Sequence, residues 1–253
     1  LFGVVDCGTN TFNLLIGRKT ASGWELVFSN KMPVKIGAGG FDAKQIMPDR
    51  MARGLDVLDH YHKTCLSYGV QSVYVFATSA LRDATNAHVF VQHVKANCGW
   101  EVNIISGDEE AELIFKGVQK SVDLSSKSAL IMDIGGGSTE FIIVKDGQDV
   151  WRKSYPLGVS RLFERIQPQS RITQKDLQTF KKILDDTTSD LAEALHQFPC
   201  PMLIGSSGSF DTLLALYYHA SRQKDDLSET VCQEIPVSAF SSIHMQMMGS
   251  TLE

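Results

Sequence analysis

Two aspartates, each followed by a turn rich in glycine and hydroxyl side chains, are the residues best placed to do chemistry in this sequence. The first turn is residues 6–11 (DCGTNT) and the second is residues 133–138 (DIGGGS), so both read Asp-x-Gly-x-x-[Ser/Thr]. Glycine lets the backbone approach a ligand closely, and the amide groups of such a turn can donate hydrogen bonds to phosphate oxygens. The aspartate can hold Mg²⁺ directly or through water. The repeat therefore predicts two related lobes that face one ligand.

A third loop of this kind, residues 205–209 (GSSGS), stands between an expected strand and an expected helix. Backbone amides and a helix N-terminus favour an anion at such a place, although a flexible turn has the same composition. The phosphate-binding candidates of the three loops are Asp6, Gly8, Thr9, Asn10, Thr11, Gly135, Gly136, Gly137, Ser138, Gly205, Ser206, Ser207 and Gly208.

An acidic run and an arginine are the remaining candidates. Residues 108–110 (Asp-Glu-Glu) open an expected helix, where they could compensate the helix dipole. Alternatively, one of these carboxylates could accept the proton of an attacking water. Arg82 follows the end of an expected strand, where it is either a surface residue or a clamp for phosphate, whose geometry suits a guanidinium. The residues alone leave both pairs of alternatives open.

The expected secondary structure places strand ends at these positions. In the first half we expect strands at 2–7, 12–18, 24–30, 73–77 and 102–105, and helices at 49–67, at 87–96 and from the 106–110 turn to about 118. The alternation of strands and helices predicts an α/β fold with mixed sheets.

The second half repeats this order. A meander of strands is expected over 129–156, and after it one long helix whose apolar face runs from Leu177 to Leu195 and whose capping box is formed by Thr173 and Asp176. A short strand at 202–204 and a helix from near Phe210 come next. The polar stretch 119–127 predicts the boundary between an N-terminal lobe, 1–122, and a C-terminal lobe, 123–253.

Composition restricts the ligands and the compartment. The chain has 253 residues and a net charge of −5, which repels nucleic acid and polyphosphate alike, so an anionic ligand needs a local site or metal ions. The five cysteines form no CxxC pair, which favours a reducing cytoplasm. No apolar run is long enough to cross a membrane, so we expect no membrane partner, and we expect both chain ends to be truncated.

Five motifs in this order resemble the exopolyphosphatase/guanosine-pentaphosphate phosphatase (Ppx/GppA) family of the acetate and sugar kinase/heat-shock chaperone/actin superfamily. They are DCGTNTFNLLI, ATSALRDATN, ISGDEEAELIFKGV, MDIGGGSTEF and IGSSGSFDTL, and the resemblance extends from residue 2 to at least residue 220. It implies two ribonuclease-H-like (actin-like ATPase) lobes with a cleft between them. It also implies release of terminal phosphate from inorganic polyphosphate or guanosine pentaphosphate with Mg²⁺, and it is compatible with a homodimer.

Carried over by position, the resemblance makes Glu110 the base that activates water and Arg82 the phosphate clamp. It makes Asp133 and Glu140 the holders of Mg²⁺, with help from Asp6. The stretch Lys35-Ile36-Gly37 departs from the family, which usually has arginine at the first of these positions.

The two aspartate turns differ in one further position. Glu140 stands in the second copy where Asn13 stands in the first, so we expect the metal near the second copy and a phosphate cradle at the first. Two other functions fit the paired turns: an acetate- or sugar-kinase-like phosphotransferase, and a protein that binds a nucleotide or alarmone without turnover.

Overall fold

The computed structural model describes residues 1–250 except Ser22, Ser170 and residues 222–231. The chain divides into two compact units. The first comprises Leu1–Glu110 together with Gly136–Ser138 and Val159–Glu164. The second comprises Ala111–Gly135, Thr139–Gly158 and Arg165–Glu253.

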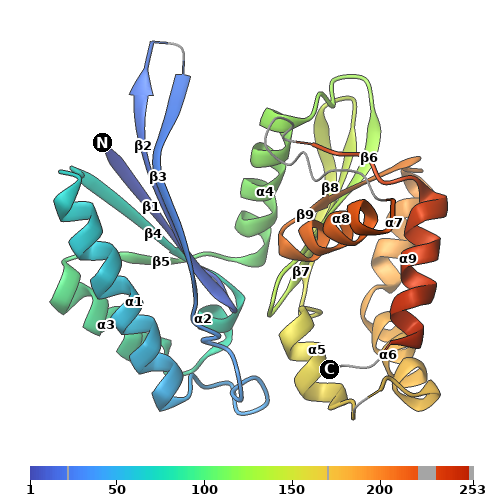
Figure 1. Ribbon diagram of the computed structural model, residues 1–253, viewed down its shortest axis with the longest axis horizontal. Coiled ribbons are helices and arrows are strands. Elements are labelled where there is room, and N and C mark those ends of the chain that lie inside the picture. Colours follow the sequence, from blue (N-terminus) through green and yellow to red (C-terminus); the bar gives the residue numbers. More distant parts are fainter. Residues whose placement is uncertain (22, 170, 222–231, 251–253) are drawn as a thin grey trace. The chain divides into compact units, whose positions relative to one another are not determined.

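The first unit is built on a mixed sheet with the strand order β3-β2-β1-β4-β5 (Figure 1). The strands are β1 (Phe2–Cys7), β2 (Thr11–Thr20), β3 (Gly23–Pro33), β4 (Ser72–Ala77) and β5 (Val102–Ile104). Strand β1 is antiparallel to β2 and parallel to β4. The expected strands and their mixed arrangement are therefore confirmed.

The helices of the first unit are α1 (Pro48–Ser67), α2 (Ser79–Asp83) and α3 (Ala87–Cys98). Proline stands in the first turn of α1, and Gly99 ends α3 in the left-handed conformation with a φ of 71°. The buried core includes Leu58 and Tyr61 of α1 and Phe12 of β2. The buried hydroxyl of Tyr61 donates to the carbonyl of Phe12 over 2.8 Å, so it is satisfied inside the core.

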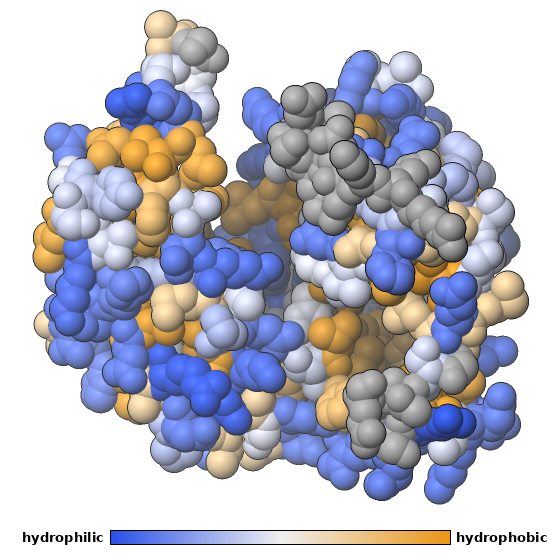
Figure 2. All heavy atoms as spheres, viewed as in Figure 1, coloured by the Kyte–Doolittle hydropathy of each residue, from blue (hydrophilic) through white to orange (hydrophobic). Residues whose placement is uncertain are grey.

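The two faces of this sheet differ in their exposure to solvent. Val5 and Cys7 of β1 are buried in the core, whereas Val4 is 38% exposed. Leu15 and Tyr74 flank Val4 in register and are also exposed. Figure 2 also shows hydrophobic residues, in orange, on the surface of the first unit below the β2–β3 hairpin.

The second unit contains a mixed sheet with the order β8-β7-β6-β9. The strands are β6 (Ser128–Ile134), β7 (Thr139–Lys145), β8 (Gln148–Tyr155) and β9 (Met202–Ser206). Helix α4 (Gly107–Ser121) packs on this sheet, because Ala111 and Phe115 join Ile131 and Ile142 in one buried cluster. The boundary between the two units thus lies between Glu110 and Ala111, whereas the sequence predicted it between residues 122 and 123.

The remaining helices are α5 (Val159–Ile166), α6 (Gln174–Thr187), α7 (Ser189–Gln197), α8 (Gly208–Ser221) and α9 (Val237–Gly249). The capping box of Thr173 and Asp176 at the start of α6 is confirmed. None of the helices in the described part of the chain is long and apolar enough to cross a membrane.

The single long helix expected behind Thr173 is wrong, because α6 ends at Thr187 and α7 begins at Ser189. The hydroxyls of Thr187 and Thr188 donate to the carbonyls of Ile183 and Leu184, four residues back. Hydrogen bonds of this kind, together with β-branching, make consecutive threonines poor at continuing a helix.

Candidate functional site

The first aspartate turn joins β1 to β2 in the first unit. Asp6 lies opposite Asn13 in the antiparallel register, and Asn13 Nδ2 donates to Asp6 Oδ2 over 3.0 Å. The Gly8 amide donates to the Thr11 carbonyl over 3.1 Å, and a Cβ on Gly8 would lie 2.9 Å from that oxygen. Glycine is therefore required here by the tightness of the turn.

The segment between β3 and α1, residues 34–47, covers this turn. The amides of Val34 and Lys35 both donate to the carbonyl of Asn10 over 2.9 Å. A Cβ on Gly37 would lie 2.7 Å from the Phe41 ring and 3.0 Å from the Thr9 methyl group, so only glycine permits this approach. Thr9 itself is buried.

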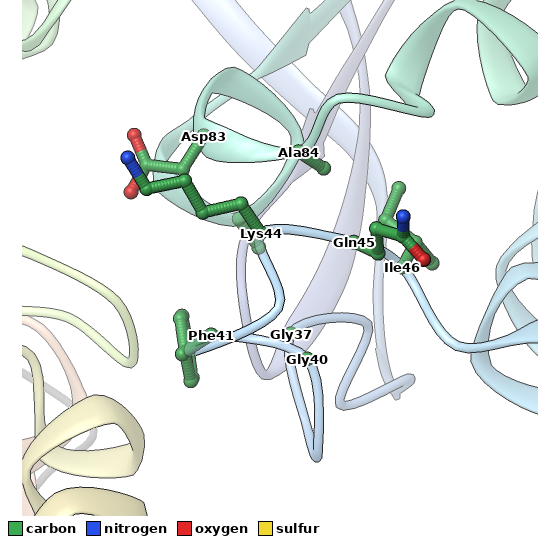
Figure 3. A pocket seen from close by; sticks show the side chains of 9 residues that line it. Gly37, Gly40, Phe41, Lys44, Gln45, Ile46, Asp83 and Ala84 are labelled. Carbon is green, nitrogen blue, oxygen red and sulfur yellow. The ribbon is translucent and has the colours of Figure 1, made fainter.

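A small pocket lies between this segment and helix α2. It is lined by Gly37, Gly40, Phe41, Lys44, Gln45, Ile46, Ala80, Asp83 and Ala84 (Figure 3). The ends of the Lys44 and Asp83 side chains point the same way, and Phe41 lies apart on the lower loop. The pocket thus adjoins the helix that carries Arg82.

The structure brings together Arg82 and Glu110, the two residues to which the resemblance assigns the clamp and the base. Arg82 Nη1 lies 3.0 Å from Glu110 Oε2 and donates over the same distance to the carbonyl of Ile105. The two side chains are 22% and 17% exposed, so the ion pair is largely shielded but reachable from solvent. Arg82 lies in the last turn of the short helix α2, and Glu110 lies in the first turn of α4.

The neighbouring Glu109 has a structural function. Its carboxylate accepts a hydrogen bond from the Ser106 amide over 2.8 Å, and its own amide donates to the Ser106 hydroxyl over 3.1 Å. This reciprocal pattern is a capping box. The backbone N–H of Ser106, and secondarily its hydroxyl, lower the pKa of Glu109. The two glutamates of the acidic run therefore have different partners: Glu109 caps the helix, and Glu110 faces Arg82.

The second aspartate turn joins β6 to β7 in the second unit with the same register as the first. Asp133 lies opposite Glu140, where Asp6 lies opposite Asn13. Glu140 is 1% exposed and accepts a hydrogen bond from the Ser154 hydroxyl over 2.6 Å. Burial raises the pKa of Asp133, and the Ser206 and Ser207 hydroxyls lower it to a smaller extent.

The third loop lies beside this turn, because β9 is parallel to β6 and Ser206 is in register with Asp133. The Ser207 hydroxyl donates to the carbonyl of Ile134 over 2.9 Å. Ser207 has a φ of 69°, an uncommon conformation for a residue other than glycine. A Cβ on Gly205 would lie 2.0 Å from the Phe210 ring, so packing alone requires this glycine. The second and third loops therefore lie side by side, an arrangement that follows from the pairing of β9 with β6.

The glycines at the tip of the second turn are placed in the first unit. A Cβ on Gly136 would lie 2.8 Å from the Asn10 side chain. A Cβ on Gly137 would lie 2.6 Å from Ser79 Oγ and 2.7 Å from Thr9 Oγ1. Ser138 is buried. These glycines are therefore needed for close packing, a role that the sequence did not separate from phosphate binding.

A Mg²⁺ ion suits the donors around Asp133. Asp133 and Glu140 are opposite one another in the register of the antiparallel pair, where two like charges are unfavourable and a cation between them would be favourable. Among the described residues, no group of three or more His, Cys, Asp or Glu side chains is arranged to hold a metal ion. Two carboxylates suffice for Mg²⁺, which usually keeps several waters and takes further ligands from phosphate. The residues present are therefore compatible with Mg²⁺, and Asp133 and Glu140 are its candidate ligands.

Helix α5 contributes polar residues to the first unit. These residues were not identified from the sequence. Ser160, Arg161 and Glu164 contact residues of the first turn, of helix α2 and of the 34–47 segment. A signal for this helix exists in the sequence, since Val159, Leu162, Phe163 and Ile166 recur at helical spacing. Its polar partners are distant in the chain and have no such signal.

Comparison with known proteins identifies relatives of this chain. The chain is 29% identical over 213 residues to a guanosine-5'-triphosphate,3'-diphosphate pyrophosphatase of Pseudoalteromonas translucida. A protein of the same description from Photobacterium profundum is 28% identical over 213 residues. The matches cover 84% of this chain and 43% of each relative, so the chain spans less than half the length of these curated relatives.

Solved structures extend the comparison to the fold. An exopolyphosphatase from Cytophaga hutchinsonii is 33% identical with a TM-score of 0.95, over 99% of this chain and 80% of that one. A Ppx/GppA family member from Aquifex aeolicus shares the fold with a TM-score of 0.77, at 22% identity over 99% of this chain and 79% of that one. The model of the Ppx/GppA phosphatase family matches residues 15–250. With its paired aspartate turns and its arginine–glutamate pair, the chain belongs to the Ppx/GppA phosphatase family.

Proposed function

We propose that this protein is a phosphohydrolase that releases terminal phosphate from inorganic polyphosphate, from guanosine pentaphosphate, or from both. The observation that carries the proposal is the ion pair of Arg82 and Glu110, held at 3.0 Å by the ends of two helices. A base that orients water and a guanidinium that neutralises phosphate are the parts such hydrolysis requires. The descriptions of the relatives, a pentaphosphate pyrophosphatase and an exopolyphosphatase, agree with it.

In this proposal Glu110 accepts the proton of the water that attacks the terminal phosphorus in line with the leaving oxygen. Arg82 Nη1 lies 3.0 Å from Glu110 Oε2, so the proposed base and the proposed clamp act side by side. Arg82 also stabilises the negative charge on the transferring group. Phosphoryl transfer depends mainly on positioning and electrostatics, so both groups must be held accurately.

Mg²⁺ belongs to the proposal as the expected metal. When bound, it would neutralise charge on the phosphate oxygens. Asp133 and Glu140 would hold it, with help from Asp6. The candidate phosphate-binding residues of the three loops would donate hydrogen bonds from amides and hydroxyls, which a chain of net charge −5 needs in order to hold a polyanion.

We further propose a cytoplasmic enzyme that works without nucleic acid or membrane and that can form a homodimer. All five cysteines are free thiols, which agrees with a reducing compartment. The net charge of −5 disfavours nucleic acid.

The test is a phosphate-release assay with long polyphosphate, short polyphosphate and guanosine pentaphosphate, each with Mg²⁺ and with chelator. We expect release from at least one substrate that depends on Mg²⁺. Consumption of ATP that depends on an added acceptor would instead identify a phosphotransferase. Tight binding of guanosine pentaphosphate by calorimetry, with no release under Mg²⁺, would identify a non-catalytic binder.

A further inference from the structure

The guanidinium of Arg161 in helix α5 joins three segments of the first unit. Its Nε donates to the carbonyl of Gly137 over 2.8 Å, and its Nη2 donates to Ser79 Oγ over 3.3 Å and pairs with Asp83 Oδ2. Its Cζ lies 4.4 Å from the centre of the Phe41 ring. The side chain is only 19% exposed, so these contacts are largely shielded from water.

The backbone around Arg161 fixes the same region. The amides of Ser160 and Arg161 both donate to the carbonyl of Gly136, over 2.9 and 3.2 Å. The Ser160 hydroxyl donates to Asn10 Oδ1 over 2.8 Å, and Glu164 Oε1 accepts from the Gly39 amide over 2.6 Å. All these residues belong to the first unit. Helix α5 therefore contacts both the first aspartate turn and residues Gly136–Ser138, which we call the glycine tip.

Helix α2 is held from two sides by this arrangement. It has five residues, too few to be rigid by themselves. Arg82 reaches toward Ile105 and Glu110, whereas Ser79 and Asp83 are bonded to Arg161. The contacts made by Arg161 thus set the position and orientation from which Arg82 extends.

We propose that Arg161 is a positioning residue that fixes helix α2, and through it Arg82, against the glycine tip Gly136–Ser138. This inference rests on the proposed phosphohydrolase function and adds a residue to it. Only arginine suits the position, because a planar guanidinium can serve a carbonyl, a hydroxyl and a carboxylate while its face lies against an aromatic ring. Lysine would keep the charge but would not reach all these partners at once.

The test compares Arg161→Met and Arg161→Lys with the wild-type protein, with Arg165→Met as the matched control. Arg165 lies one turn further along the same helix and is exposed. With the substrate that the wild type hydrolyses best, we expect kcat of Arg161→Met to fall by about 10²-fold, the cost of a misplaced clamp, while KM changes less. We expect the kcat of Arg161→Lys to lie between those of Arg161→Met and the wild type. The kcat of Arg165→Met should stay within about twofold of the wild type, since this substitution alters only the surface.

Two further measurements separate positioning from general destabilisation. In an Arg82→Ala background, Arg161→Met should have little further effect on kcat, whereas a residue that only stabilises the fold would lower activity by the same factor in both backgrounds. Hydrogen–deuterium exchange of Arg161→Met should speed up in peptides covering residues 78–84 and 135–138 and stay unchanged in α1.

The outcomes are distinct for the two proposals. Failure of the wild-type protein to release phosphate from any substrate contradicts the proposed function. An active wild type with normal kcat in Arg161→Met overturns the role of Arg161, and so does unchanged exchange in both peptides. Equal loss of activity with and without Arg82 overturns it as well.

Discussion

Glu109 and Glu110 are adjacent and chemically identical, yet the structure gives them different functions. The Glu109 carboxylate accepts the Ser106 amide in a capping box, whereas the Glu110 carboxylate pairs with Arg82. The difference arises from the helix, since residues one apart point in directions about 100° apart. One substitution, repeated at the two positions, can therefore separate capping from catalysis.

We expect Glu110→Gln to lower phosphate release by about 10²–10⁴-fold, because glutamine cannot accept the proton of the attacking water. Glu109→Gln is the matched control, since glutamine also completes a capping box, and it should keep activity within a few-fold. Initial rates with saturating substrate measure both variants. Near-normal release by Glu110→Gln would remove Glu110 from the role of base.

Asp133, a proposed ligand of Mg²⁺, lowers the stability of the folded protein when it is ionised. Its pKa is raised mainly by burial, so its charged form is disfavoured in the folded protein. A group with a raised folded pKa binds its proton more tightly in the native state. Its ionisation therefore destabilises the fold progressively as the pH rises from about 3.9, the unfolded value, through the higher folded value.

We expect Asp133→Asn to be more stable than the wild type at neutral pH in chelator, with the difference vanishing at acidic pH. Asp190 provides a control of opposite sign, because hydrogen bonds from Lys153, and secondarily from Tyr155, lower its pKa. Asp190→Asn should therefore lose stability at neutral pH. Urea unfolding across the acidic to neutral range measures both variants. Added Mg²⁺ should stabilise the wild type but not Asp133→Asn, and equal stabilisation would remove Asp133 from the metal site.

At the scale of elements, helices α4 and α6 begin with the same capping box but carry different residues in their first turns. Helix α4 is preceded by Ser106 with Glu109 as its partner, and α6 by Thr173 with Asp176 as its partner. Only α4 carries a candidate catalytic residue in its first turn. We therefore expect the cap of α4 to position Glu110 in addition to stabilising the helix.

We expect Ser106→Ala and Thr173→Ala each to cost about 1 kcal/mol in the free energy of unfolding, the usual value of an N-cap. Only Ser106→Ala should also lower phosphate release, because fraying of the first turn moves Glu110. Thr179→Ala, at an exposed position within α6, controls for the loss of a threonine and should be nearly neutral. Equal activities of the two cap variants would show that the α4 cap has no part in positioning.

At the scale of the whole molecule, the five free thiols differ in how far they are exposed to solvent. Cys7 and Cys65 are buried, Cys98 and Cys200 are intermediate and Cys232 is exposed. Burial, with a smaller contribution from Asp6, raises the pKa of Cys7 well above its ordinary value, and burial raises the pKa of Cys65 to about 11. Thiolates are the reactive form, so both thiols should be inert in the folded protein.

We expect native alkylation with iodoacetamide to label Cys232 first and to leave Cys7 unlabelled until denaturant is added. Phosphate release should survive the labelling of Cys232. Peptide mass spectrometry over time gives the order of labelling. Rapid labelling of Cys7 accompanied by loss of activity would show instead that Cys7 takes part in the reaction.

The sequence by itself determined the strands, helices α1, α3, α4 and α8, and the equivalence of the two aspartate turns. These are local properties, since the alternation of apolar residues and the Asp-x-Gly signature lie within short segments. The identical register of Asp6 with Asn13 and of Asp133 with Glu140 results from turns of equal length between paired strands. The motifs also predicted the family, because each combines turn chemistry with the strand that precedes it.

Tertiary structure alone decided which residues meet. Arg82 and Glu110, which the resemblance named, pair with each other in the structure. The contacts of Arg161 with Asp83, Ser79 and Gly137 are not indicated by any pattern in the sequence around these residues. The division of α4 between the units and the break at Thr188 also depend on packing and on competing side-chain hydrogen bonds. Contacts between residues far apart in the chain depend on how whole elements pack, and no short segment encodes that.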